Sequence, residues 1–166
     1  MQVPSQSDVA GLLQRLVAQE LPSGSGLQSW DSFLRAHATL MRRLELDLEQ
    51  VTGLALADFD VLAQLARAGG ELRMTDLATR ALVSRSGMTR RVARLVEEGL
   101  VGRANTDADG RGVVVTLTDA GVARLTETAP VHLRGVSELF VTQLDDRELA
   151  VLWSALDKVT VDCTFG

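Results

Sequence analysis

The sequence contains little of the chemistry on which most enzymes and metalloproteins depend. It has no tyrosine, one cysteine and two histidines in 166 residues. A disulfide within the chain is therefore excluded, and a thiolate or imidazole metal site has few available ligands. Side chains that act as acids or bases near neutral pH are equally scarce, and no nucleophile elbow, zinc-protease motif or phosphate loop occurs. We therefore expect that the protein is not an enzyme and that it holds neither a cofactor nor a metal ion.

Long apolar runs are also missing. The longest is far shorter than the roughly 18 residues that a membrane-spanning helix needs. Residues 1–7 contain no basic patch followed by an apolar stretch, so no secretory signal is visible. The single cysteine, Cys163, is compatible with a reducing compartment. These absences favour a cytoplasmic protein that has no contact with a membrane.

The acidic net charge of −5 is unevenly distributed. From Arg73 to Arg111 there are eight arginines and five acidic residues, a local charge of +3, which leaves −8 for the rest of the chain. A basic region on an acidic protein suits binding in a DNA groove, because attraction to phosphates is screened beyond about one Debye length. The charge distribution thus favours nucleic acid as a partner despite the sign of the total.

Apolar periodicity and turn residues predict a mainly α protein with a small β-hairpin. The expected helices are at about 8–21, 27–50, 57–68, 75–80, 84–98, from 119, and 144–161, and the expected strands are at 100–104 and 113–117. We divide the chain into an N-terminal helical extension with a flexible link (1–26), a long amphipathic helix (27–56), a winged helix-turn-helix lobe (57–118) and C-terminal helices (119–166). The predicted helix caps are Thr75, Ser84, Thr118 and an Asp145/Glu148 capping box.

The order of short helix, turn, basic helix and hairpin is typical of DNA-binding proteins. On the basic helix, one face is apolar and consists of Met88, Val92, Leu95 and Val96. The opposite face consists of Ser86, Gly87, Arg90 and Arg94. Small residues allow close approach to the major groove, and an arginine there can bind guanine O6 and N7. Ser84 and Thr89, near the helix N-terminus, are expected to bind phosphates. The alternative is that the two arginines merely form a solvated face.

The hairpin tip carries Asp109-Gly110-Arg111. An arginine at the end of a projecting wing suits a narrow minor groove, where the negative potential is enhanced. Asp109 lies two residues away and can orient the guanidinium group. The alternative is an ordinary polar turn with an incidental ion pair.

Two stretches carry a resemblance to a known family. Met74-Thr75-Asp76-Leu77-Ala78 and the segment 83–101 (VSRSGMTRRVARLVEEGLV) resemble the helix-turn-helix of the MarR (multiple antibiotic resistance regulator) family. The Asp-x-Arg and Leu-Thr-x-x-Gly signatures of its wing are matched by Asp109-Gly110-Arg111 and Leu117-Thr118-Asp119-Ala120-Gly121. The resemblance covers about residues 28–161. Gly112 stands where many members carry a residue with a side chain.

The resemblance implies a homodimer that binds a palindromic operator in double-stranded DNA, with the first and the last two family helices at the dimer interface. It implies repression that a small aromatic or phenolic effector relieves. Residues placed near the family's effector cleft are Trp30, His37, Arg42, Phe59 and Asp60. Against this, aromatics and a histidine at helical spacing are more often core residues. The segment 1–26 either packs on the dimer or is a dispensable tail.

The sequence supports three other functions less well. A winged-helix module that binds proteins instead of DNA does not need guanidinium groups on both the helix and the wing, where Arg90, Arg94 and Arg111 lie. A metal-sensing winged-helix repressor is disfavoured because the chain has only one cysteine and two histidines. A thiol-based sensor is disfavoured because the only cysteine is three residues from the C-terminus.

Overall fold

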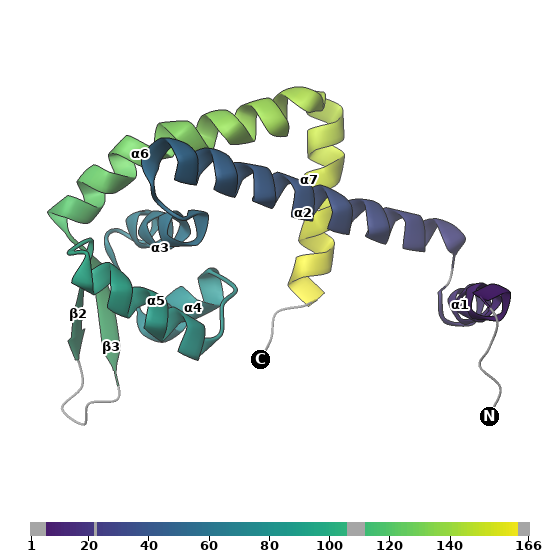
Figure 1. Cartoon of the computed structure of the whole chain (residues 1–166), viewed down its shortest axis with the longest axis horizontal. Helices are drawn as coiled ribbons and strands as arrows, with labels where there is room; N and C mark the ends of the chain where they lie inside the picture. The colour runs from purple at the N-terminus through teal and green to yellow at the C-terminus, as the bar shows by residue number, and fades with distance from the viewer. Residues whose placement is uncertain (1–5, 22, 106–111, 163–166) are drawn as a thin grey trace. The chain divides into compact units, whose positions relative to one another are not determined.

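The computed structural model describes residues 6–21, 23–105 and 112–162. Its elements, in chain order, are α1 (Gln6–Glu20), α2 (Gly24–Thr52), α3 (Leu56–Arg67), β1 (Glu71–Arg73), α4 (Met74–Arg80), α5 (Arg85–Glu97), β2 (Val101–Asn105), β3 (Val113–Leu117), α6 (Asp119–Leu139), a 3₁₀ turn η1 (Val141–Gln143) and α7 (Asp146–Asp162) (Figure 1). The predicted mainly α fold with a small β wing is confirmed. Among the described residues, no helix has the length and apolar character required to cross a bilayer.

The chain divides into two compact units, Met1–Arg42 and Arg43–Gly166. The first contains α1 and the beginning of α2. Its apolar side chains are largely exposed, among them Trp30 (55% exposed) and Phe33 (43%). The flexible link predicted before residue 27 is shorter than expected, since α2 already begins at Gly24. Extending an existing helix adds one hydrogen bond per residue fixed, so a long helix can incorporate even a glycine- and serine-rich first turn.

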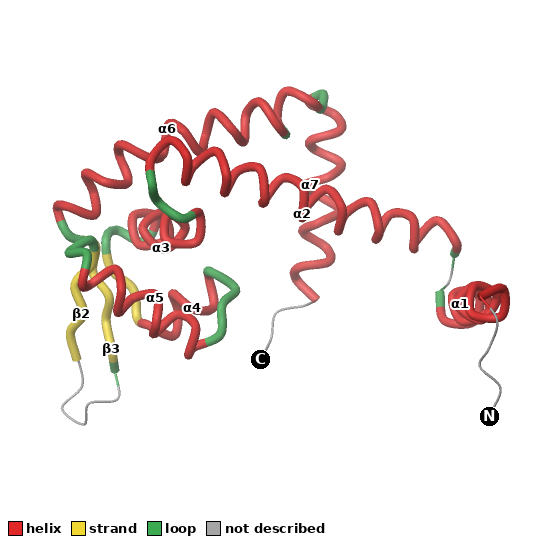
Figure 2. The backbone as a smooth tube through the Cα atoms, in the orientation of Figure 1, coloured by secondary structure: helices red, strands yellow, loops and turns green. Residues whose placement is uncertain are grey.

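The second unit contains the hydrophobic core. Figure 2 shows α3 between α6 and the α4–α5 pair. The largest fully buried apolar side chains come from these helices, from β3 and from the end of α2: Leu48, Val61, Leu62, Leu65, Leu77, Met88, Val92, Leu95 and Val115. The predicted apolar face of α5 is confirmed for three of its four residues. Val96 is 39% exposed because it lies at the edge of the stripe, one residue after the central Leu95.

The sheet has three strands in the order β1-β3-β2, and both pairs are antiparallel. The predicted hairpin is β2–β3, with Val101 opposite Leu117 at its base. The third strand, β1, was not predicted; it pairs Leu72 with the fully buried Val115. A strand of three residues is too short to show alternation in the sequence, and only its pairing with β3 identifies it.

Most predicted caps are confirmed. The Ser84 Oγ accepts a hydrogen bond from the Gly87 N–H (3.2 Å). Asp145 and Glu148 form the expected reciprocal bonds of 2.9 and 2.8 Å. The predicted Thr75 cap is wrong, because α4 begins at Met74 directly after the extended Arg73, which makes no side-chain cap bond. Since β1 runs straight into α4, the helix begins before the threonine can cap it.

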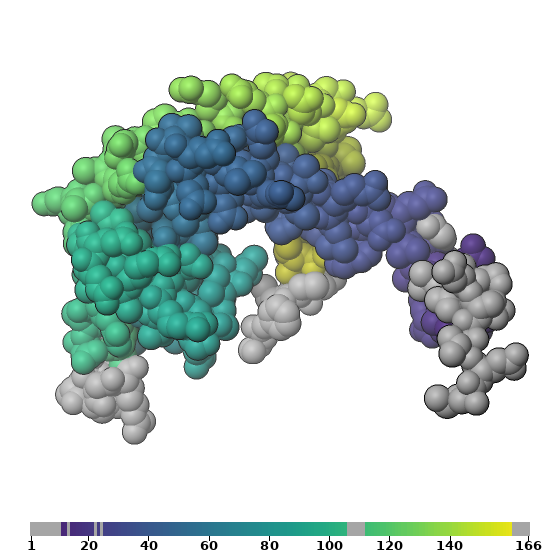
Figure 3. Space-filling model, in the orientation of Figure 1, coloured from purple at the N-terminus to yellow at the C-terminus, as the bar shows by residue number. Residues whose placement is uncertain are grey.

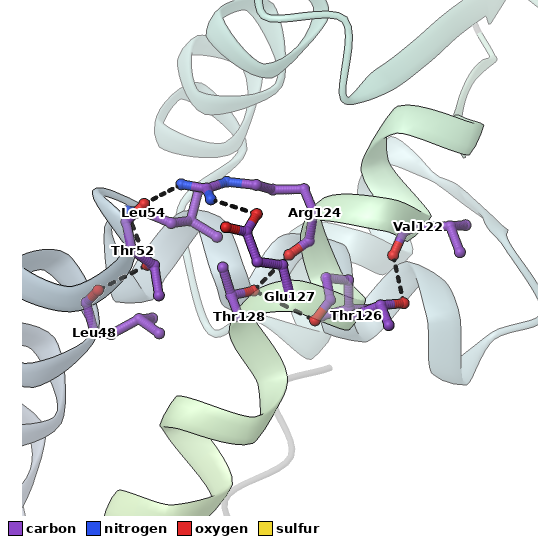
Figure 4. Close-up of polar contacts among 9 residues, drawn as sticks. Leu48, Thr52, Leu54, Val122, Arg124, Thr126, Glu127 and Thr128 are labelled. Atoms are coloured by element: carbon purple, nitrogen blue, oxygen red, sulfur yellow. Dashed lines mark hydrogen bonds and ion pairs between the residues drawn. The ribbon is translucent and has the colours of Figure 1, made fainter.

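Hydrogen bonds across the second unit fix the end of α2 to α6 (Figure 4). The Arg124 guanidinium donates to the carbonyl of Thr52 and pairs with Glu127 at 2.9 Å. The Thr52 hydroxyl donates to the Leu48 carbonyl (2.7 Å) and accepts from the Leu54 N–H (3.2 Å). A cation at a helix C-terminus satisfies a terminal carbonyl and the helix dipole together. These contacts determine where the chain leaves α2 and enters α3, and so where the winged lobe begins.

Leu82 lies in the turn between α4 and α5 and is the only described non-glycine residue with a positive φ, at 53°. Its side chain is 92% exposed, so no packing offsets the conformation. Left-handed geometry costs an L-residue about 1–2 kcal/mol, and glycine carries an entropic penalty of about 0.5–1 kcal/mol. We predict that Leu82→Gly raises the free energy of unfolding by up to about 1 kcal/mol, measured by urea denaturation. Leu82→Ala retains a Cβ and is expected to give no gain; an equal gain from both variants would contradict strain at this residue.

Gly121 explains the Leu-Thr-x-x-Gly signature. Thr118 caps α6 by accepting from the Gly121 N–H (3.0 Å) and donates to the Gly99 carbonyl (2.7 Å), which brings α6 onto the end of α5. A Cβ on Gly121 would lie 2.1 Å from the Leu100 carbonyl oxygen. We predict that Gly121→Ala lowers the free energy of unfolding by about 2 kcal/mol or more, because backbone must move. The control Gly26→Ala, whose nearest neighbour would be 3.7 Å away, is expected to cause no loss in the same denaturation experiment.

Candidate nucleic-acid interface

The start of α5 presents small polar side chains. The turn before it is closed by a bond from the Val83 N–H to the Ala78 carbonyl (3.0 Å). Ser84 and Ser86 are both exposed, with their hydroxyl oxygens 3.3 Å apart. This arrangement places two hydroxyl groups at the N-terminus of a 13-residue helix. Such a terminus attracts anions, because its first N–H groups have no partner within the helix.

Gly87 has an explanation within the protein. A Cβ there would lie 2.9 Å from Val83 Cγ1 and 3.1 Å from Ser84 Oγ. The glycine therefore allows the turn to pack against the first turn of α5. The sequence interpretation assigned the small side chain to close approach of DNA, and that role stays a prediction.

Arg90 and Thr89 lie on the exposed side of α5. The Arg90 side chain makes no ion pair or hydrogen bond within the described residues, so its guanidinium group is available. The Thr89 hydroxyl donates to the Arg85 carbonyl one turn earlier (2.9 Å) and retains its acceptor capacity. As predicted, the outer face of α5 carries a free cation one turn from the helix start.

Arg94 is in a different situation from Arg90. Its Nη2 contacts both carboxylate oxygens of Asp58, at 2.6 and 2.5 Å, and Arg91 Nη1 contacts one of them at 2.9 Å. Asp58 is 5% exposed. The hydrogen bond and the charge of Asp58 raise the pKa of Arg94 above its usual value. The sequence predicts that Arg94 faces DNA from the outer side of α5. In the structure its guanidinium group is bound to a buried carboxylate on α3.

Asp58 was not among the predicted site residues, although the sequence contains a signal for it. Asp58 precedes Leu62 by four residues and Leu65 by seven, a spacing that places it on the buried face of α3. A carboxylate on an apolar stripe requires a cation or a hydrogen-bond donor. The chain contains several arginines, some of them closer to Asp58 in sequence than those of α5, and only the tertiary structure shows which of them pair with it.

The two wing residues Asp109 and Arg111 lie outside the described residues. The strands that lead to them are described, and both belong to the three-stranded sheet. Gly112, at the start of the return strand, is buried.

Among the effector candidates, Trp30, His37 and Arg42 lie in the first unit. The Phe33 ring is 6.1 Å from that of Trp30 and 6.3 Å from that of His37, measured between centroids, and all of these side chains are exposed. The expectation that Trp30 and His37 are core residues therefore fails within a single chain. A helical stripe indicates burial but does not say whether the covering surface belongs to the same chain.

Phe59 and Asp60 lie in the second unit, near a histidine that sequence analysis did not place there. The Phe59 ring is buried and lies 4.6 Å from the His132 ring of α6. Burial lowers the pKa of His132, Asp60 opposes this effect and Arg67 adds to it. The Asp60 carboxylate also accepts a hydrogen bond from Gln64 (3.3 Å). His132 Nδ1 is buried without a hydrogen-bond partner in the described part of the chain.

A helix-turn-helix followed by a β-hairpin, with a basic and exposed recognition helix, defines a winged-helix DNA-binding protein. In the space-filling view, the teal and green atoms of α4, α5, β2 and β3 form one continuous lobe (Figure 3).

Comparisons with known proteins agree with this class. Residues 52–112 match the sequence model of the MarR family. The chain is 32% identical over 106 residues to an HTH-type transcriptional regulator of Bacillus cereus, covering 64% of this chain and 69% of the relative. The fold is similar to that of AbsC, a MarR family regulator from Streptomyces coelicolor (TM-score 0.79, 29% identity, 87% of this chain and 97% of the other). It is also similar to Sco3205 of the same organism, solved in complex with DNA (TM-score 0.81, 28% identity, 89% and 92%).

The protein belongs to the MarR family of DNA-binding transcriptional regulators, and it is not an enzyme. The resemblance inferred from the helix-turn-helix and wing motifs is confirmed.

Proposed function

We propose that this regulator acts in the cytoplasm as a homodimeric repressor that binds a palindromic operator and releases it when a small aromatic ligand binds. The carrying observation is the exposed N-terminal part of α5, where Ser84, Ser86, Thr89 and the unpaired Arg90 form one polar surface. These residues and Gly87 are the proposed major-groove contacts. Asp109 and Arg111 are proposed to contact the minor groove from the wing.

The apolar surface of the long helices supports the homodimer. In α7, Val151 is 63% exposed, Trp153 is 74% exposed and Val159 is 61% exposed. In α2, Trp30, Phe33, Leu34 and Met41 are 39–55% exposed. Large apolar side chains with this degree of exposure indicate an interaction site on a folded chain. We propose that a second copy of the chain packs against these side chains, because closed two-fold dimers are the commonest assemblies and fit a palindromic DNA site.

The ligand part of the proposal rests on the family resemblance and on two groups of residues. Phe59, His132 and Asp60 supply a ring, an imidazole whose pKa is lowered by burial, and a carboxylate in the second unit. Trp30, His37 and Arg42 supply aromatic and basic groups in the first. An aromatic acid matches such surfaces, since rings stack and a basic group pairs with the carboxylate.

Arg90 provides the test of DNA recognition. We predict that Arg90→Ala reduces the preference for the correct base at one position per half-site, at a cost of about 1–3 kcal/mol, because a guanidinium group can bind guanine through two bonds. Fluorescence anisotropy of wild-type protein and variant would be measured against duplex from the upstream region of the gene, single-base variants of it and a scrambled duplex. Arg147→Ala, which removes an exposed arginine from α7, is the control and is expected to change nothing.

A uniform loss of affinity across all duplexes would assign Arg90 to a phosphate instead. Equal and weak binding of the wild type to operator and scrambled duplex, repeated on fragments selected from the whole genome, would favour the protein-interaction module considered above.

Trp153 tests the dimer. We predict that wild-type protein sediments at twice the chain mass of 17.9 kDa and that Trp153→Glu shifts the equilibrium toward the monomer, because a charge replaces a large apolar contact at the interface. Leu82→Glu places the same charge on an exposed leucine of the helix-turn-helix and is expected to remain dimeric. A monomeric wild type, or dissociation by both variants alike, would contradict the proposed interface.

A further inference from the structure

We propose that Asp58 is a specificity-determining residue that withholds Arg94 from DNA phosphates. The inference rests on the proposed contact between α5 and DNA, and it changes which residues of α5 make that contact. Arg90 contacts DNA, while Arg94, one turn further along the same helix, does not. Asp58 itself lies on α3 and touches no DNA, so it acts through Arg94 as a positioning residue.

The geometry of the cluster differs from that of a surface ion pair. The Asp58 side chain is 6% exposed, and Arg94 Nη2 bonds both of its oxygens. Arg91 Nη1 binds the same carboxylate from its more buried position, with 26% of its side chain exposed against 51% for Arg94. A buried carboxylate is strongly unfavourable without such partners, so the pairing persists whether DNA is present or absent.

Arg94 also has a second acidic neighbour. Its Nε lies 3.8 Å from the Glu98 carboxylate one turn later in α5. Arg94 is therefore flanked by acids from two elements, whereas Arg90 has no acidic partner among the described residues. A helical wheel places Arg90 and Arg94 on the same face of the helix, but they differ in how strongly their positive charge can attract a phosphate.

This difference bears on specificity. Contacts to phosphates raise affinity for every DNA sequence alike, while contacts to base edges distinguish sequences. An arginine that is bound to a buried carboxylate and lies beside a second acid, Glu98, adds little to binding at random sites. The ratio of operator affinity to non-specific affinity, which decides occupancy in a genome, is higher as a result.

Asp58→Asn tests the inference with an isosteric change. One carboxylate oxygen becomes an N–H donor, so the side chain can no longer accept both bonds from Arg94. On scrambled duplex, we expect log K to fall more steeply with log salt, by about 0.9 for each released arginine and about 1.8 for a dimer. Raising the salt concentration fourfold should then weaken the variant about twelvefold more than the wild type. A merely destabilised protein would show weaker binding without the steeper dependence.

The matched control is Asp47→Asn. It changes the net charge by the same amount and releases Arg43 from an exposed pair of 3.0 Å within α2, outside the winged lobe. Its salt dependence should equal that of the wild type. Thermal unfolding of both variants sets a temperature at which each is folded during the titrations.

Arg94→Gln tests the inference without breaking the buried pair, because Asp58 retains its bond with Arg91. We expect it to leave the salt dependence unchanged in the wild-type background and to restore the wild-type dependence in the Asp58→Asn background. A shallower dependence for Arg94→Gln alone, or no steepening in folded Asp58→Asn, would overturn the inference while leaving the proposed function intact. A wild-type protein with no operator preference would instead overturn the proposed function and this inference with it.

Discussion

The orientation of α5 within the winged lobe depends on the pairing of the buried Asp58 carboxylate with Arg91 and Arg94. This pairing joins α3, which forms the centre of the core, to α5, which carries the polar surface offered to DNA, through arginines at 2.5–2.9 Å. Apolar packing alone would hold α5 against α3, but it is not directional. Bonds from two guanidinium groups to one carboxylate are directional, and they fix which side of α5 faces outward. Removal of both arginines would leave the buried carboxylate without a cation.

A second set of contacts determines where the lobe begins and ends. Arg124 holds the Thr52 carbonyl at the end of α2, and Thr118 holds the Gly99 carbonyl at the end of α5. The two contacts come from α6 and from its N-cap residue, so one helix constrains both the entry to the lobe and its exit. Gly121 permits this arrangement, since any side chain would collide with the Leu100 carbonyl. The wing hairpin therefore leaves α5 in a direction that α6 fixes.

Much of this fold could be predicted from the sequence because its determinants are local. Ser84 and Thr118 cap their helices through residues three positions away, and the 3.6-residue period identifies the apolar face of α5 from Met88, Val92 and Leu95. The short β1 strand and the start of α4 could not be predicted in this way. Both depend on pairing with β3, which lies more than 40 residues further along the chain.

The sequence by itself determined the order of the elements, the family and the polar character of the recognition helix, since each follows from residues close together in the chain. Tertiary structure alone decided which arginine is free. Periodicity places Arg90 and Arg94 on the same face of α5, yet Asp58, 36 residues before Arg94, pairs with Arg94 and not with Arg90. It likewise brought His132 to Phe59, which lies far earlier in the chain. Charge pairing depends on distances of a few ångströms, and chain folding sets those distances between segments that local patterns treat as independent.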